Sequence, residues 1–165
     1  MSYLLLLLFN LYSLNPSFEE LWEKDFSQIP ELEGYQLFPA EAPSFVKGDF
    51  FGDGISDWAF LVKDSIGQVQ LIYINEGEKR QLHWLGKEND PFNLSDYSWA
   101  QVFQKASAGN VLWANYVDGY RDFKEVPESE KVILEYDALY LHLREACGGG
   151  FIYWQNGEFH WLQQE

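Results

Sequence analysis

The spacing of hydrophobic residues is helical near the N-terminus and becomes strand-like further along the chain. An apolar stripe at positions i, i+3, i+4 and i+8 is formed by Phe18, Leu21, Trp22 and Phe26. This spacing predicts an amphipathic helix over residues 17–29, with Ser17 as its N-cap. Pro30 follows directly and is expected to end the helix, because proline lacks the backbone N–H that a continuing helix needs.

Short apolar or alternating runs predict strands in most of the remaining chain. The expected strands cover residues 58–62, 68–74, 79–85, 111–117 and 132–143, with a shorter one around Leu37. Turn residues at 64–67 favour a hairpin between the first two strands. Residues 86–98 are polar and are predicted to form a loop, whereas residues 99–105 are predicted to form a short helix.

The C-terminal segment gives the clearest hairpin signal. Asn156-Gly157 is the preferred pair for a type I′ turn, and aromatic-rich runs flank it on both sides. With the earlier strands, this hairpin predicts an α+β fold. We expect a mainly antiparallel β-sheet with an N-terminal helix and a C-terminal aromatic β-hairpin, in a single domain over residues 16–165.

The first 15 residues contain an apolar run from Leu4 to Phe9, extended towards Leu14. The run is shorter than the ~20 residues that cross a bilayer, and it matches the hydrophobic part of a secretory signal peptide. We therefore predict a signal peptide at 1–15, a periplasmic or secreted protein, and no stable membrane insertion after processing. No Lys or Arg precedes the run and no small-x-small cleavage site follows, so a buried strand or helix is the alternative.

The charge of the chain narrows the classes of partner. Eleven Lys and Arg residues stand against 26 Asp and Glu residues among 165, which gives a net charge of −15. Nucleic-acid binding needs clustered cations, and this composition disfavours it. Acidic groups such as Glu125, Glu128 and Glu130 are typical of a solvated face. An alternative function is an acidic inhibitor or immunity-type protein that binds a basic protein partner.

One segment carries a pattern with specific chemistry, the loop from Gly48 to Asp57. Its acidic residues Asp49, Asp53 and Asp57 occupy loop positions 1, 5 and 9. Gly54 stands at position 6, where the chain of such a loop turns sharply, and Ile55 at position 7 would offer its backbone carbonyl. Carboxylate and carbonyl oxygens suit a hard cation, so the spacing predicts a Ca²⁺ site made by Asp49, Asp53, Ile55 and Asp57.

Two positions depart from a helix–loop–helix calcium site. Position 3 is Phe51 in place of Asp or Asn, and position 12 is Phe60 in place of Glu, followed by a strand-like run. An Asp-rich loop that enters a strand resembles the loops of FG-GAP and VCBS-type modules, and GDFFGDGISDWAFLV matches their pattern except at Phe51. More weakly, the whole chain resembles small exported bacterial proteins with one such loop and a C-terminal "YW-x-NG-x-F" hairpin. The resemblance implies a non-enzymatic, extracytoplasmic calcium-binding module.

Catalytic chemistry finds little support in the remaining residues. Cys147 precedes three glycines and could act as a nucleophile with His142 or His160 as base, but a lone cysteine is more often a small apolar core residue. The histidines, including His83, show no paired metal-ligand spacing. We therefore predict that the protein is not an enzyme.

The predictions of calcium binding and of export depend on each other. Extracellular calcium loops often bind with dissociation constants of ~10⁻⁴–10⁻³ M, and a site of that affinity would stay empty in the cytosol.

Overall fold

The computed structural model describes residues 18–38, 45–88, 90–145 and 148–164. The described residues fall into two compact units, which are divided between Glu33 and Gly34. The expected signal peptide at 1–15 and the expected N-cap Ser17 lie outside the described residues. No helix in the described ranges is long and apolar enough to cross a membrane.

The N-terminal unit contains one short helix followed by two 3₁₀ turns. Helix α1 covers Phe18–Lys24, and the turns η1 and η2 cover Phe26–Gln28 and Pro30–Leu32. The α-helix is thus shorter than the predicted 17–29, because the chain tightens into 3₁₀ geometry after Asp25. Pro30 opens η2 instead of ending a helix, since its fixed φ suits the first position of a helical turn.

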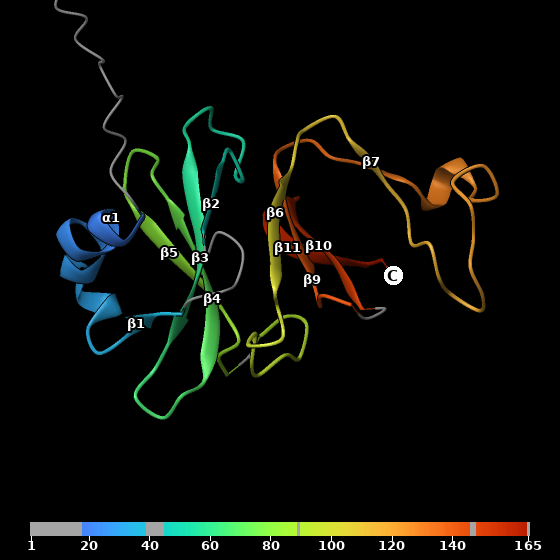
Figure 1. Cartoon of the computed structure of the whole chain (residues 1–165). Coiled ribbons are helices and arrows are strands. Elements are labelled where there is room, and N and C mark those ends of the chain that lie inside the picture. The colour runs from blue at the N-terminus through green and yellow to red at the C-terminus, as the bar shows by residue number, and fades with distance from the viewer. Residues whose placement is uncertain (1–17, 39–44, 89, 146–147, 165) are drawn as a thin grey trace, which may run out of the picture. The chain divides into compact units, whose positions relative to one another are not determined.

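The second unit is built from antiparallel strands in three sheets (Figure 1). A five-stranded sheet contains β1 Gln36–Leu37, β2 Phe45–Gly48, β3 Asp57–Lys63, β4 Val69–Asn75 and β5 Gln81–Leu85. A four-stranded sheet contains β6 Val102–Ala106, β9 Ala138–His142, β10 Gly149–Gln155 and β11 Glu158–Gln163. The third pairs β7 Val111–Leu112 with β8 Val132–Ile133. One further 3₁₀ turn, η3, covers Glu128–Glu130.

The two larger sheets share one hydrophobic core. Its buried members from the five-stranded sheet and the adjoining loop include Val46, Phe50, Ala59, Leu61, Leu71 and Tyr73. Those from the four-stranded sheet include Phe103, Leu139, Leu141 and Ile152. In each strand the core residues alternate with residues of the opposite face, as the period-2 geometry of a strand requires. This shared core fixes the loops at the strand ends of both sheets.

The predicted C-terminal hairpin and its turn are confirmed. Asn156 and Gly157 have φ values of 53° and 86°, the left-handed geometry that a type I′ turn needs. Tyr153 pairs with His160 and Trp154 with Phe159 across β10 and β11. The fold is mainly antiparallel β with one N-terminal α-helix, as predicted.

Three predicted segments differ from the structure. The predicted helix at 99–105 is wrong: Val102–Ala106 form strand β6, and Phe103 is fully buried against the core. Strand β7 ends at Leu112 instead of 117, and 132–143 is divided into β8 and β9. For β6 a long-range partner decides the outcome, because it is hydrogen-bonded beside β9, which a local pattern cannot foresee.

Candidate metal loop between β2 and β3

The Asp-rich loop connects the antiparallel neighbours β2 and β3. Gly48 is the last residue of β2 and pairs with Asp57, the first residue of β3, so the loop closes on a strand pair. Gly52 and Gly54 have φ values of 77° and 79°, a left-handed conformation that side chains with a Cβ rarely adopt. The sharp turn expected at Gly54 is therefore present, and a second one occurs at Gly52.

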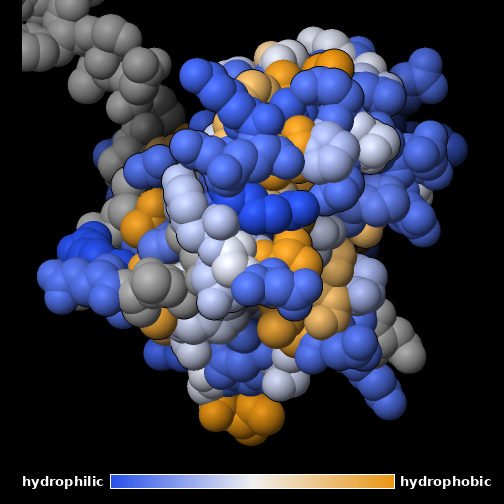
Figure 2. Space-filling view, turned by 90° about the vertical axis from the view of Figure 1, so that its right-hand side faces the viewer, coloured by the Kyte–Doolittle hydropathy of each residue, from blue (hydrophilic) through white to orange (hydrophobic). Residues whose placement is uncertain are grey.

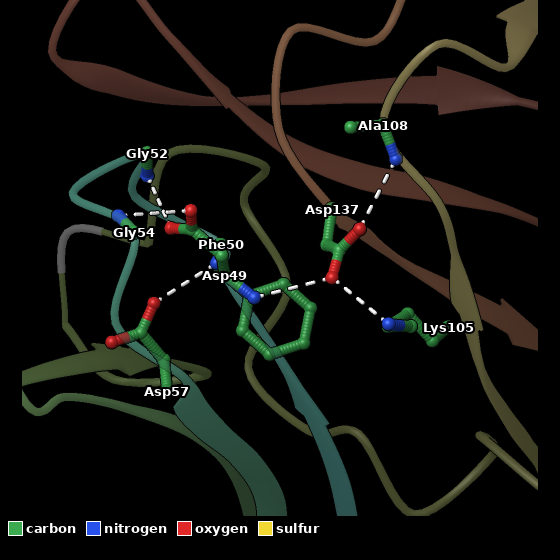
Figure 3. A network of polar contacts seen from close by, with 8 residues as sticks. All are labelled: Asp49, Phe50, Gly52, Gly54, Asp57, Lys105, Ala108 and Asp137. Carbon is green, nitrogen blue, oxygen red and sulfur yellow. Dashed lines mark hydrogen bonds and ion pairs between the residues drawn. The ribbon is translucent and has the colours of Figure 1, made fainter.

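The carboxylate of Asp49 is directed at the backbone of its own loop (Figure 3). One of its oxygens accepts a hydrogen bond from Gly52 N–H at 2.7 Å, and the other accepts one from Gly54 N–H at 3.0 Å. Such side-chain bonds to nearby backbone N–H groups stabilise tight acidic turns without any ion. Each carboxylate oxygen keeps a further lone pair after accepting one N–H, so these bonds orient Asp49 without exhausting its capacity as a ligand.

Asp57 is fully buried at the start of β3. Its two oxygens accept hydrogen bonds from Phe50 N–H at 2.9 Å and Glu76 N–H at 3.1 Å. Burial raises the pKa of Asp57 to about 6, against the lowering effect of these N–H groups, and the nearby charge of Asp53 raises it further. Asp57 thus joins the beginning of the loop to the end of β4.

Asp53 and Ile55 lie on the exposed side of the loop. Asp53 accepts a hydrogen bond from Ile55 N–H at 2.8 Å, and the Ile55 side chain is 43% exposed. The other Asp53 oxygen lies against Gly77, where a Cβ would approach it to 2.7 Å. A glycine at 77 therefore leaves the space that the Asp53 carboxylate occupies.

Phe51, the residue that departs from the calcium-loop pattern, packs into an aromatic cluster. Its ring stacks on His83 with centroids 4.7 Å apart and meets Trp154 edge-on at 5.1 Å. Burial in this surrounding lowers the pKa of His83, because the charged imidazolium is poorly solvated there. An apolar ring thus attaches the loop to the C-terminal hairpin at position 3, where calcium loops of this pattern usually carry Asp or Asn.

Asp137 was not predicted as part of this site, although it connects the loop to the four-stranded sheet. It accepts hydrogen bonds from Asp49 N–H at 3.1 Å and Ala108 N–H at 3.1 Å, and its carboxylate lies 3.0 Å from the Lys105 ammonium (Figure 3). Its own N–H donates to the Asp49 carbonyl at 2.9 Å. No local motif marks Asp137, since its partner Asp49 is 88 positions away.

Hard oxygen donors of the kind that calcium prefers are present on this loop. Within the part of the chain that the structure describes, no group of three or more His, Cys, Asp or Glu side chains is arranged to hold a metal ion. The carboxylates of Asp49, Asp53 and Asp57 instead accept the backbone bonds given above, so the expected ligand set is not preformed. Calcium binding by Asp49, Asp53, Ile55 and Asp57 stays a prediction.

His142 and His160, the two candidate catalytic bases, contact residues of their own four-stranded sheet. His160 bonds through its ring to the Gln155 carbonyl at 3.1 Å, and His142 stacks on Tyr140 with centroids 5.7 Å apart. Cys147 lies outside the described residues. Gly149 and Gly150 stand inside β10, where a Cβ would meet a neighbouring carbonyl at 2.4 Å in both cases. The lack of a Cβ at these two positions lets the neighbouring strands β9 and β11 approach closely.

Comparison with known protein families, curated proteins and solved structures gave no match.

Proposed function

We propose that this chain is a non-enzymatic exported domain whose Asp49–Asp57 loop has a structural role and is stabilised by one calcium ion. The observation that carries the proposal is that Asp49, Asp53 and Asp57 stand on one loop closed by the β2–β3 strand pair, where the charge of Asp53 contributes to raising the pKa of Asp57. Asp53 and Asp57 stand on the same turn at the spacing seen in FG-GAP and VCBS-type loops. The role of the ion is to offset the repulsion between these carboxylates.

The position of the loop explains why an ion there would matter for the whole domain. Through Asp57 the loop is bonded to Glu76 at the end of β4, and through Asp49 it is bonded to Asp137 beside β9. An ion that binds only the folded loop stabilises the folded state by mass action. At a dissociation constant of ~0.5 mM, about 5 mM calcium contributes ~1.4 kcal/mol.

The test is thermal unfolding of the chelator-treated protein with and without calcium. We expect about 5 mM calcium to raise the melting temperature by ~4 °C, and the same concentration of magnesium to raise it less. Asp53→Ala should abolish the calcium effect, because it removes a proposed ligand. Asp53 is exposed, so the substitution leaves the hydrophobic core intact. Asp64→Ala is the matched control: Asp64 accepts similar turn bonds from Ile66 and Gln68 N–H groups in the β3–β4 turn.

The outcomes separate clearly. A calcium response in the native chain and in Asp64→Ala, but not in Asp53→Ala, supports the proposal. No response in the native chain, or an equal response in Asp53→Ala, overturns it and leaves the loop stabilised by its own hydrogen bonds alone.

Export needs its own test. A site of about millimolar affinity would be filled by calcium only if the protein is exported, because calcium reaches millimolar concentration outside the cytoplasm. Mass spectrometry of the protein purified from its source should show a mature chain that lacks residues 1–15. An intact N-terminus in the purified protein would contradict the proposed signal peptide.

A further inference from the structure

The longest connection in the second unit is the extended loop, residues 113–131, which lies between β7 and β8 and extends away from the two larger sheets (Figure 1). Its arms are held together by their own contacts. Trp113 and Phe123 meet edge-on with centroids 5.0 Å apart, and the Lys131 ammonium lies 4.0 Å above the Phe123 ring. Val126 is buried within the loop at 3% exposure.

Polar contacts fix the same arms. The Arg121 guanidinium donates to the Ala114 carbonyl at 2.9 Å and pairs with Glu130 at 2.7 Å. Arg121 N–H donates to the Asn115 carbonyl at 2.8 Å. The loop is therefore ordered before any binding event, which lowers the conformational entropy that docking would cost.

At the end of this loop, three large hydrophobic side chains face solvent. Tyr116, Val117 and Tyr120, which we call the aromatic tip, are 46%, 58% and 71% exposed. Two other strongly exposed hydrophobic residues lie elsewhere: Ile66, at 83%, on the β3–β4 turn, and Ile133, at 64%, in strand β8. Figure 2 looks onto the side of the molecule that carries the extended loop, where hydrophilic residues in blue surround smaller hydrophobic areas in orange. Tyrosine on a preordered loop with a polar rim is typical of protein interfaces.

The charges around the tip favour a cationic partner. The two cations Arg121 and Lys131 are paired with Glu130 and Glu128, at 2.7 and 2.6 Å, inside the loop. Asp118 stands within the tip, and Asp122 and Glu125 follow it, against one further cation, Lys124. The whole chain carries a net charge of −15, which repels anionic membranes and a second copy of itself.

We propose that the aromatic tip is a docking surface for a basic protein. The tyrosines and Val117 enter an apolar recess of the partner, and Asp118 and the neighbouring acids face its cationic rim. Such complementarity speeds association and makes it sensitive to salt. This inference does not depend on calcium binding by the Asp49–Asp57 loop.

The test begins with a photo-crosslinking amino acid at Val117 in the full chain, incubated with the exported proteins of its source. The captured protein is identified, purified and titrated against the native chain at two salt concentrations. We expect a protein of net positive charge, and a dissociation constant that rises about tenfold or more in Tyr120→Ala, as at an interface hot spot. Raising the salt should slow association.

Ile66→Ser is the matched control, because Ile66 is also a strongly exposed hydrophobic residue and lies on the β3–β4 turn. It should leave the dissociation constant within about twofold, as expected for a residue outside the interface. Asp118→Lys should weaken binding by reversing the charge at the tip. Melting temperatures of all variants establish that each is folded.

The proposal is overturned if nothing is crosslinked or the captured protein is acidic. The proposal is also overturned if Ile66→Ser weakens binding as much as Tyr120→Ala does. The same holds if Tyr120→Ala and Asp118→Lys both bind as tightly as the native chain. Crosslinking only to a second copy of the chain, or to an oligosaccharide, would assign the tip to a different class of partner and likewise reject the proposal.

Discussion

The Asp49–Asp57 loop and the extended loop 113–131 are both acidic connections between strands, and both carry aromatic residues. In the first, Phe50 is 1% exposed and Phe51 packs on His83, while the carboxylates bind backbone N–H groups. In the second, Tyr116 and Tyr120 face solvent, while Glu128 and Glu130 pair with side-chain cations. Acidic composition alone therefore does not distinguish a loop whose side chains pack and bond within the fold from one whose aromatic side chains face solvent.

The difference is in where the interaction energy is used. The hydrogen bonds that the first loop makes with buried or partly buried backbone groups contribute to folding. Their loss should lower the free energy of unfolding. Exposed aromatic side chains of the second contribute little to folding and are available for association. Substitutions in the first loop should therefore be costly for stability, and substitutions at the aromatic tip should be nearly neutral.

The largest expected effect is that of Asp57→Ala. It removes the acceptor for Phe50 and Glu76 N–H groups, and unsatisfied buried donors cost ~1–3 kcal/mol each. We expect urea unfolding without calcium to show a loss of about 3 kcal/mol in the free energy of unfolding. Asp53→Ala, which removes an exposed carboxylate with one backbone bond, should cost about 1 kcal/mol or less. Equal losses in the two variants would show that burial of Asp57 is not what stabilises the loop.

The next effect separates two glycines of the same loop. Gly52 and Gly54 have nearly the same positive φ, but a Cβ at Gly52 would meet the Tyr136 ring at 2.0 Å, whereas one at Gly54 meets nothing within 4 Å. Gly54→Ala should cost ~1 kcal/mol from backbone strain, and Gly52→Ala ~3 kcal/mol because the Tyr136 ring must also move. Parallel denaturation curves measure both. If Gly52→Ala is no worse than Gly54→Ala, the packing of Tyr136 on the loop is not important for stability.

The sequence predicted those parts of the fold whose signals are local. The Asn156-Gly157 turn, the β3–β4 hairpin and the sharp turn at Gly54 each depend on residues that are neighbours in the chain. The helix predicted at 99–105 failed because β6 is defined by its pairing with β9, more than 30 positions away. Asp137 was missed for the same reason, since its role depends on contacts with Asp49 and Lys105.

The candidate site was predictable only in part. Spacing identified Asp49, Asp53 and Asp57 as members of one turn, but it could not show that Asp57 is buried or that Phe51 packs on the C-terminal hairpin. Both properties depend on the other elements of the core. The exposure of the aromatic tip was equally invisible in the sequence, because tyrosine and valine occur both in cores and on surfaces.

A third prediction concerns the cluster that holds Phe51. Because burial lowers the pKa of His83, the folded protein binds fewer protons there than the unfolded chain. The stabilising contribution of the neutral imidazole is complete above the unfolded pKa of about 6.5 and decreases as the pH falls below it. His83→Phe keeps a ring beside Phe51 and removes the proton site, so it should lose less stability than the native chain between pH values of about 7.5 and 5. Identical pH dependence in the two proteins would contradict this.

The smallest expected effect is at the aromatic tip. Tyr116 and Tyr120 are 46% and 71% exposed, so replacing both with Ser should change the free energy of unfolding by no more than ~0.5 kcal/mol. Phe51→Ser is the counterpart in the Asp-rich loop and should cost ~2–3 kcal/mol, because its ring contacts His83 and Trp154. Urea denaturation of both variants provides the comparison. A loss above ~1 kcal/mol in the double tyrosine variant would mean that the two tyrosines stabilise the fold. A loss of binding on replacing them could then result from lower stability instead of a lost contact with the partner.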